Sequence, residues 1–288
     1  MPELNVFCQQ FEKRFVGWAS ANPDIRAAIV VGSRARRDNP ADEWSDLDIL
    51  LFAQNVERYQ DQQDWIEALA PTWMVLQSRT VMNDPEQVVL FAGGFRTDFV
   101  FHTADVLSGV KDMVENNQVP AVIARGARVL IDKDHAIPKL PAPARPGPAQ
   151  PPSQADFQKA VDTFWFQAVF AAYQLRRGEM VPFKAVDIGL KWQLISLLEW
   201  NVHSLKGGAV DTWHAGRFLS EWLDPGDLAE FSASYAPCNR EESWTAFNIL
   251  LDLYQRKALE TARQLGYPER SVWMGEIRSY LYKVFEER

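Results

Sequence analysis

Apolar residues near the amino terminus recur at steps of three and four along the chain. This spacing places them on one face of a helix, so the pattern predicts an amphipathic helix over residues 3–20. The pair Asn22-Pro23 ends the predicted helix, because proline cannot continue the helical backbone. The apolar positions are Leu4, Phe7, Phe11, Phe15 and Trp18.

Residues 27–31 form a short, fully apolar run that ends at Gly32, which predicts a buried strand followed by a turn. Strand and helix patterns then alternate, and together they predict a small mixed sheet with helices. These further elements are a strand over 46–52, a helix over 57–70, a strand over 73–77, a hairpin over 88–101 that turns at Gly93-Gly94, a helix from Thr103 to about 115 and a strand over 127–131.

A proline-rich stretch over residues 138–154 separates a part in which strand and helix patterns alternate from a part with long helical patterns. Proline fixes φ and lacks a backbone donor, so we expect an extended linker here, with a ligand for an SH3-like groove as the alternative. Long helical patterns follow and predict a helical bundle. The expected fold class is therefore α+β, with a sheet domain over 1–137 and a helical domain over 155–288. The predicted helices span 155–177, 183–204, 212–223 and 242–265, with stops at Gly178, Gly207-Gly208, Pro225 and Gly266.

The composition and charge of the chain disfavour several classes of partner and site. The 288 residues carry a formal net charge of -8, which disfavours nucleic acid as a partner, because affinity there comes from cations that neutralise phosphates. Two cysteines and four histidines give no disulfide framework and no zinc spacing. No apolar run could span a bilayer and no signal-peptide pattern begins the sequence, so we expect a cytoplasmic protein without membrane partners.

A Gly-Ser turn and an Asp-x-Asp pair carry the chemistry. Gly32 and Ser33 lie between a predicted strand and a predicted helix start, where free backbone N–H groups favour a phosphate. Asp46 and Asp48 alternate along a predicted strand, so both carboxylates project from one face. Neighbouring carboxylates repel each other, and a divalent cation such as Mg²⁺ held between them explains why both are present.

Asp98, in the predicted hairpin, could supply a third acid from a neighbouring strand. An anion site with three such carboxylates fits metal-dependent nucleotidyl transfer, in which cations bridge a triphosphate and pyrophosphate leaves. Each feature also has an ordinary interpretation, since Gly-Ser turns are common, a strand-end aspartate can cap a turn, and Asp98 can pair with a neighbour. The combined spacing favours the functional interpretation.

The segment Gly32-Ser33-Arg34, followed by Asp46-x-Asp48, resembles the signature of the DNA polymerase β-like nucleotidyltransferase superfamily. The longer stretch, with Asn39-Pro40 and Trp44-Ser-Asp-Leu-Asp-Ile, is similar to the aminoglycoside 6-adenylyltransferase (streptomycin adenylyltransferase) family. Leu47, where that family usually has an aromatic residue, and the proline-rich linker mark a divergent relative. Similar segments continue at Phe164-Trp165-Phe166, Lys191-Trp192, Gly216-Arg217-Phe218-Leu219 and Ala262 to Tyr267-Pro268.

The resemblance implies a nucleotidyltransferase catalytic domain over 1–137 and a helical acceptor-binding domain over 155–288, with Mg²⁺ and ATP bound in the cleft between them. The implied activity transfers AMP from ATP to a hydroxyl of an aminoglycoside such as streptomycin, releases pyrophosphate and confers antibiotic resistance. Two Mg²⁺ ions are expected.

The resemblance also assigns roles to the motif residues. Gly32, Ser33 and Arg34 would hold the triphosphate. Asp46 and Asp48 would ligate Mg²⁺. Asp98 would be the third acid, either as a metal ligand or as the general base that takes the proton of the substrate hydroxyl.

A polycationic acceptor needs carboxylates for its ammonium or guanidinium groups and aromatic rings for its sugar faces. We expect Asp162 and Trp165 on one helix, and Asp187 and Trp192 on the next, to supply them, although an aromatic residue on a helix more often packs in a core. The alternatives are nucleotidyl transfer to another small molecule, a protein or RNA, and a non-catalytic nucleotide-binding relative. A monomer or a weak homodimer is expected.

Overall fold

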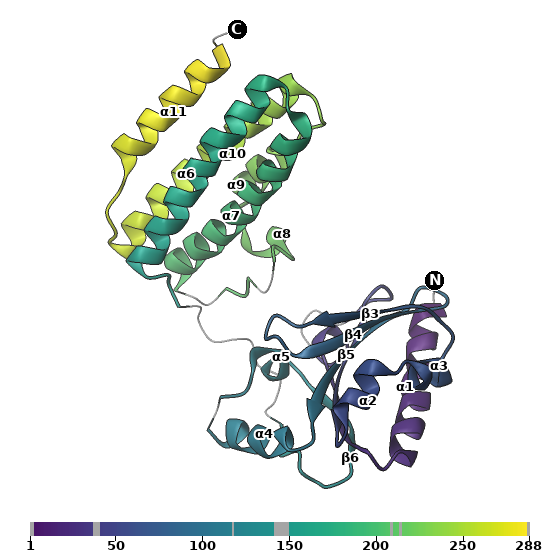
Figure 1. Cartoon of the computed structure of the whole chain (residues 1–288). Coiled ribbons are helices and arrows are strands. Elements are labelled where there is room, and N and C mark those ends of the chain that lie inside the picture. Colours follow the sequence, from purple (N-terminus) through teal and green to yellow (C-terminus); the bar gives the residue numbers. More distant parts are fainter. Residues whose placement is uncertain are drawn as a thin grey trace. The chain divides into compact units, whose positions relative to one another are not determined.

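The computed structural model describes residues 3–36, 41–116, 118–140, 150–207, 210–212 and 215–286. The chain forms two compact units, Met1–Pro146 and Gly147–Arg288, which are described separately (Figure 1). Asn39-Pro40, Gly208 and residues 141–149 of the expected linker lie outside the described residues, so the linker stays a prediction.

A six-stranded sheet forms the centre of the first unit, in the order β3-β4-β5-β2-β1-β6. The central pair β2 and β5 is parallel, and the other neighbouring strands pair antiparallel. This mixed sheet, followed by helices in the second unit, confirms the α+β prediction. The strands are β1 (Ile25–Val31), β2 (Leu47–Ala53), β3 (Thr72–Arg79), β4 (Pro85–Phe91), β5 (Arg96–Thr103) and β6 (Arg128–Asp132).

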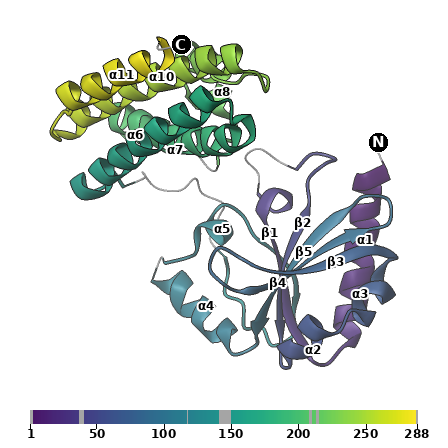
Figure 2. The same cartoon turned by 45° about the horizontal axis from the view of Figure 1, so that its top comes forward.

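Helices cover the sheet from both sides, as Figure 2 shows. On one face α1, α2 and α3 pack in a single buried cluster, in which Phe11 and Trp65 contact the ring of Phe99 from β5. On the other face α4 and α5 bury Leu107 and Ile123 against residues of β1 and β2. These helices are α1 (Glu3–Ala21), α2 (Val56–Asp61), α3 (Asp64–Leu69), α4 (Val106–Glu115) and α5 (Ala121–Ala124).

The structure departs from the predicted elements of this unit at several points. The helix expected over 57–70 is split into α2 and α3, because the Trp65 indole nitrogen donates to the Tyr59 carbonyl and satisfies the end of α2. Thr103 does not cap a helix but ends β5, and α5 was not predicted. The helix start expected after Gly32-Ser33 is a single 3₁₀ turn, η1 (Gly32–Arg34).

Three long helices, α6, α7 and α10, enclose the core of the second unit, and α11 packs along α6 (Figure 1). Left-handed Gly178, Gly207 and Gly266 end the long helices, which confirms the predicted stops at these residues. The remaining differences concern α8, α9 and α11. These six helices are α6 (Gln154–Arg177), α7 (Met180–Lys206), α8 (Leu219–Trp222), α9 (Pro225–Ala233), α10 (Arg240–Leu265) and α11 (Ser271–Glu286).

The stop predicted at Pro225 is confirmed, since α8 ends at Trp222, and Pro225 also begins α9, which was not predicted. Proline suits the first helical position because its missing N–H has no partner there in any helix, and the Asp224 side chain accepts a hydrogen bond from Gly226 N at 2.8 Å. Of the helix predicted over 212–223, the described residues form only α8, and residues 213–214 lie outside the described residues. The helix α11 was not predicted. Within the described residues, the longest helices carry too many polar side chains to cross a membrane.

Candidate active site

The turn after β1 is pressed against the carboxylate of Asp48. Gly32 has φ of +70°, and a Cβ atom built there would lie 2.1 Å from Asp48 Oδ2. A second glycine, Gly126, lies against the backbone just after this turn, where an added Cβ would lie 2.6 Å from the Cα atom of Arg36. Neither contact leaves room for a side chain, so Gly32 lets the turn lie against the metal-binding acid predicted at position 48, and Gly126 lets its own segment lie against Arg36.

Three carboxylates meet at the start of β2 and β5. Asp48 stands directly opposite Asp98 in the parallel pair, and Asp46 comes just before β2. Each of the three offers an oxygen atom that lies within 4.8 Å of the others. The structure therefore brings together the three acids that the sequence singled out, at a spacing at which they could share a cation.

Burial and mutual repulsion disfavour the charged forms of these acids. Burial raises the pKa of Asp48 from 3.8 to about 7, and the charges of Asp46 and Asp98 add to the increase. Burial also raises the pKa of Asp98 to about 6, against the opposing effect of Arg96. The metal-free protein thus holds carboxylates in a position that costs free energy, and a bound cation would offset that cost.

Two buried polar atoms beside the cluster have no hydrogen-bond partner among the described residues. They are Ser33 Oγ, in the turn predicted to hold phosphate, and Asp98 Oδ1. Arg96 Nε lies 3.4 Å from Asp98 Oδ1, an ion-pair distance without a hydrogen bond, and the guanidinium of Arg96 also binds Asp46. Buried oxygens are rarely left unpaired, so the atoms fit a site that takes polar or charged ligands.

Arg34 makes contacts in the structure beyond the phosphate contact that the resemblance implied. Its guanidinium donates to the carbonyl oxygen of Ser45 at 2.6 Å and to that of Asp46 at 3.0 Å. It also lies over the ring of Phe95. These contacts hold the backbone of the segment that leads into β2, at Ser45 and Asp46. The phosphate contact expected for Arg34 stays a prediction.

Replacing Arg34 by lysine is expected to lower the free energy of unfolding by about 1–2 kcal/mol, because lysine cannot form the forked contacts to two carbonyls. The turnover number should fall together with the free energy of unfolding, while KM for the nucleotide changes little. Thermal unfolding and initial rates check this, with the exposed Arg58→Lys as control. A large rise in KM for the nucleotide, with an unchanged free energy of unfolding, would instead show that Arg34 binds the phosphates.

The acceptor residues predicted in the second unit lie in different environments. Trp165 has 0% exposure within the core, so it contributes packing, and its expected contact with an acceptor is corrected. Asp187 is buried and paired with Lys191, which lies over the ring of Tyr235. Trp192 is 51% exposed. Of these three, Trp192 alone presents a ring to solvent.

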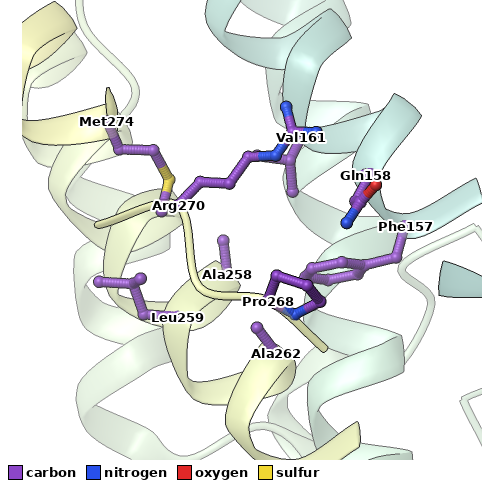
Figure 3. A pocket seen from close by; sticks show the side chains of 9 residues that line it. All are labelled: Phe157, Gln158, Val161, Ala258, Leu259, Ala262, Pro268, Arg270 and Met274. Atoms are coloured by element: carbon purple, nitrogen blue, oxygen red, sulfur yellow. The ribbon is translucent and has the colours of Figure 1, made fainter. Parts of the chain in front are cut away.

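Asp162, the fourth predicted acceptor residue, accepts a hydrogen bond from Arg270. Arg270 lines a small hollow between α6, α10 and α11 (Figure 3). The free interior of this hollow, about 10 Å³, has room for one water at most. A polycation with several rings does not fit there. The residues that line the hollow are Phe157, Gln158, Val161, Ala258, Leu259, Ala262, Pro268, Arg270 and Met274.

Sequence analysis missed two residues of this region. Arg96 joins Asp46 to Asp98, and Glu86 lies close enough to raise the pKa of both Asp48 and Asp98. Arg96 could have been found from its position two residues before Asp98, since residues i and i+2 of a strand share a face. Glu86 has no local signal, because its proximity depends on the pairing of β4 with β5.

Comparison with known proteins identifies the class to which this fold and site belong: the chain is a nucleotidyltransferase. The model of the streptomycin adenylyltransferase family matches residues 8–284, and the chain belongs to that family. It is 22% identical to the aminoglycoside 6-adenylyltransferase of Bacillus subtilis (strain 168), over 90% of this chain and 91% of that protein.

Two further relatives bear similar names. An aminoglycoside 6-adenylyltransferase from Campylobacter jejuni is 22% identical, over 88% of this chain and 87% of that protein. Among solved structures, the crystal structure of an aminoglycoside 6-adenyltransferase from Bacillus subtilis matches 94% of this chain and 96% of that chain, with a TM-score of 0.46 and 17% identity.

Proposed function

We propose that this enzyme transfers the AMP group of ATP to a hydroxyl of an aminoglycoside, with Mg²⁺, and releases pyrophosphate. The observation that carries the proposal is the register of β2 and β5, which sets Asp98 opposite Asp48 beside the Gly-Ser turn. The names of the two curated relatives support the aminoglycoside acceptor. The acidic chain suits a cationic substrate as well.

Asp46 and Asp48 are the residues that would hold Mg²⁺, with two ions expected, and Asp98 lies beside them as the third acid. The crowded carboxylates fit a cation, because a cation would relieve their mutual repulsion. When bound, Mg²⁺ supplies neutralisation of the triphosphate charge and orientation of the reacting groups.

The chain's own groups bind, orient and accept a proton. We assign Ser33 Oγ to a phosphate oxygen of ATP, since this buried hydroxyl has no hydrogen-bond partner among the described residues. Arg96 holds the carboxylate of Asp46 in place. Asp98 has a pKa of about 6, which suits a general base near neutral pH, and we assign it to accept the proton of the acceptor hydroxyl.

The test is a pyrophosphate-release screen with Mg-ATP against a panel of aminoglycosides that includes streptomycin, followed by mass spectrometry. A mass gain of one AMP on an aminoglycoside is the expected result. Expression in a streptomycin-sensitive bacterium should also raise the inhibitory concentration, and the Asp48→Asn variant should not. Labelling of a protein or RNA with no aminoglycoside product would overturn the acceptor assignment.

A separate prediction concerns the metal without nucleotide. Mg²⁺ at ten times its Kd is expected to stabilise the folded enzyme by about 1.4 kcal/mol, which raises the melting temperature by a few degrees. Asp48→Asn should abolish the increase. Differential scanning fluorimetry with and without Mg²⁺ measures it, and an equal increase in the variant would contradict a site at Asp48.

The same measurement has a defined pH dependence. Asp48 and Asp98 have folded pKa values of about 7 and about 6, above their ordinary value of 3.8. Groups with raised pKa values contribute stability that is complete below about pH 4 and is lost as the pH rises through the folded values. Mg²⁺ binds the deprotonated forms, so its stabilising effect should grow between pH 5 and pH 8.

A further inference from the structure

Glu86 lies on the same face of the sheet as the acid cluster, one strand further out. In the antiparallel pair β4 and β5, Val88 stands opposite Asp98 and Glu86 stands opposite Val100. Residues that stand opposite each other share a face, and diagonal neighbours lie about 7–8 Å apart. Glu86 is therefore a diagonal neighbour of Asp98, in agreement with its effect on the pKa of that residue.

Glu86 is a half-buried residue, and its carboxylate has no hydrogen bond or ion pair among the described residues. On the same face, the guanidinium of Arg96 is already engaged by Asp46 and Asp98. Because none of the described residues pairs with the Glu86 carboxylate, it is available to a cationic ligand. The charge on this side of the cluster is thus complementary to an ammonium or guanidinium group.

An apolar surface adjoins Glu86. We define the β3–β4 patch as Met74, Leu76, Val88 and Leu90, which share the face of Asp98. Met74 is 50% exposed and Leu76 is 57% exposed, and Val88 and Leu90 are half-buried. The patch begins beside Asp98, because Val88 is its direct partner. It offers an apolar surface for the apolar face of a sugar or cyclitol ring.

The order of the strands indicates on which side of the acid cluster each substrate lies. The sheet runs β3-β4-β5-β2-β1, and the Gly-Ser turn proposed for the triphosphate follows β1. In nucleotidyl transfer the attacking oxygen and the leaving group lie in line, on opposite sides of the phosphorus atom. With pyrophosphate leaving on the side of β1, the attacking hydroxyl approaches from the side of β4.

We propose that the acceptor lies on the β3–β4 patch and that Glu86 pairs with one of its cationic groups, close to the hydroxyl that reacts at Asp98. The inference rests on the proposed function and adds to it a binding surface and a specificity-determining residue. The acceptor class is a hydroxylated ring compound with a cation near the modified hydroxyl. In one acceptor molecule, Asp98 thus contacts the hydroxyl, Glu86 pairs with the cation and the patch contacts the ring.

The test compares Glu86→Gln with Glu67→Gln, an exposed glutamate on α3 at the other face of the sheet. Glu86→Gln is expected to raise KM for the aminoglycoside at least tenfold, with KM for ATP and the melting temperature unchanged. The control should match the wild type. Raising the ionic strength should weaken acceptor binding more in the wild type than in Glu86→Gln, because the charge pair is screened by salt.

Two further comparisons separate charge from packing. The penalty of Glu86→Gln should disappear with an acceptor whose amino or guanidino groups are acylated to neutrality, as a double-mutant cycle requires. Leu76→Ser should raise acceptor KM severalfold, whereas Val81→Ser, in the exposed turn beyond β3, should not. If Leu76→Ser lowers the melting temperature without changing acceptor KM, the patch packs against protein and the inference is overturned.

The outcomes for the inference and for the proposed function are distinct. If the wild type adenylylates an aminoglycoside and Glu86→Gln behaves like Glu67→Gln, the inference is wrong and the function stands. Calorimetry with a non-hydrolysable ATP analogue and Mg²⁺ adds a readout without turnover. If the wild type neither binds nor modifies any aminoglycoside, the proposed function is wrong and the inference fails with it.

Discussion

Asp48→Asn is expected to lower the rate of adenylyl transfer about a thousandfold. The residue faces Asp98 across the parallel pair and touches the Gly-Ser turn, so it stands at the centre of the proposed metal site. Loss of metal-assisted charge stabilisation amounts to several kcal/mol, and about 4 kcal/mol corresponds to three orders of magnitude in rate. Initial rates of pyrophosphate release at pH 8 with saturating substrates measure the effect.

The stability of the same variant should change in the opposite direction. Burial and the neighbouring acids raise the pKa of Asp48 to about 7, so above that pH its charge opposes folding. Asparagine removes the charge, and the metal-free variant should melt at or above the wild-type temperature at pH 8. Asp61→Asn, at the exposed end of α2, is the control. Turnover within a few-fold of the wild type would rule out a catalytic role for Asp48.

Gly32→Ala is expected to lower activity about a hundredfold. Its Cβ would lie 2.1 Å from Asp48 Oδ2, so the carboxylate must move, and a displacement of about 1 Å in a catalytic group can cost a factor of 10². The positive φ of +70° adds strain of about 1–2 kcal/mol, which lowers the free energy of unfolding. Rates and thermal unfolding separate the two effects.

Gly178→Ala is the matched control for this prediction. Gly178 has φ of +75°, and a Cβ atom there meets no atom within 4 Å. The control therefore carries the same backbone strain without the clash, and it lies at the end of α6, in the other unit. Both variants should lose similar stability, and only Gly32→Ala should lose activity. Equal losses of activity would show that strain rather than displacement of Asp48 is responsible.

The three acids show which contacts can be predicted from the local sequence and which cannot. Asp46 and Asp48 are two residues apart, and strand alternation alone predicts that they share a face. Asp98 comes much later in the chain and joins them because β5 pairs in parallel with β2, with Asp98 opposite Asp48. The choice of a pairing partner and register depends on contacts between distant segments, which local periodicity does not contain.

Trp165 shows where residue type misleads, and Arg34 shows contacts that residue type does not predict. An arginine in a phosphate-binding motif predicts a phosphate contact, and the structure adds that two backbone carbonyls bind its guanidinium. A tryptophan among acidic residues predicts a ring for a sugar, yet the ring lies in the core. Both side chains are long or large enough to contact either a ligand or the protein, and the surrounding residues decide which contact forms.

By itself, the sequence determined the family, the α+β class and the residue types of the site, because these follow from alternation, helical spacing and short motifs. The tertiary structure decided which side chains meet. It set Asp98 opposite Asp48, pressed Gly32 against that carboxylate and brought Glu86 to the same face. These contacts arise from strand pairing and burial between distant segments, and the free energies of such packing are not properties of any local stretch of chain.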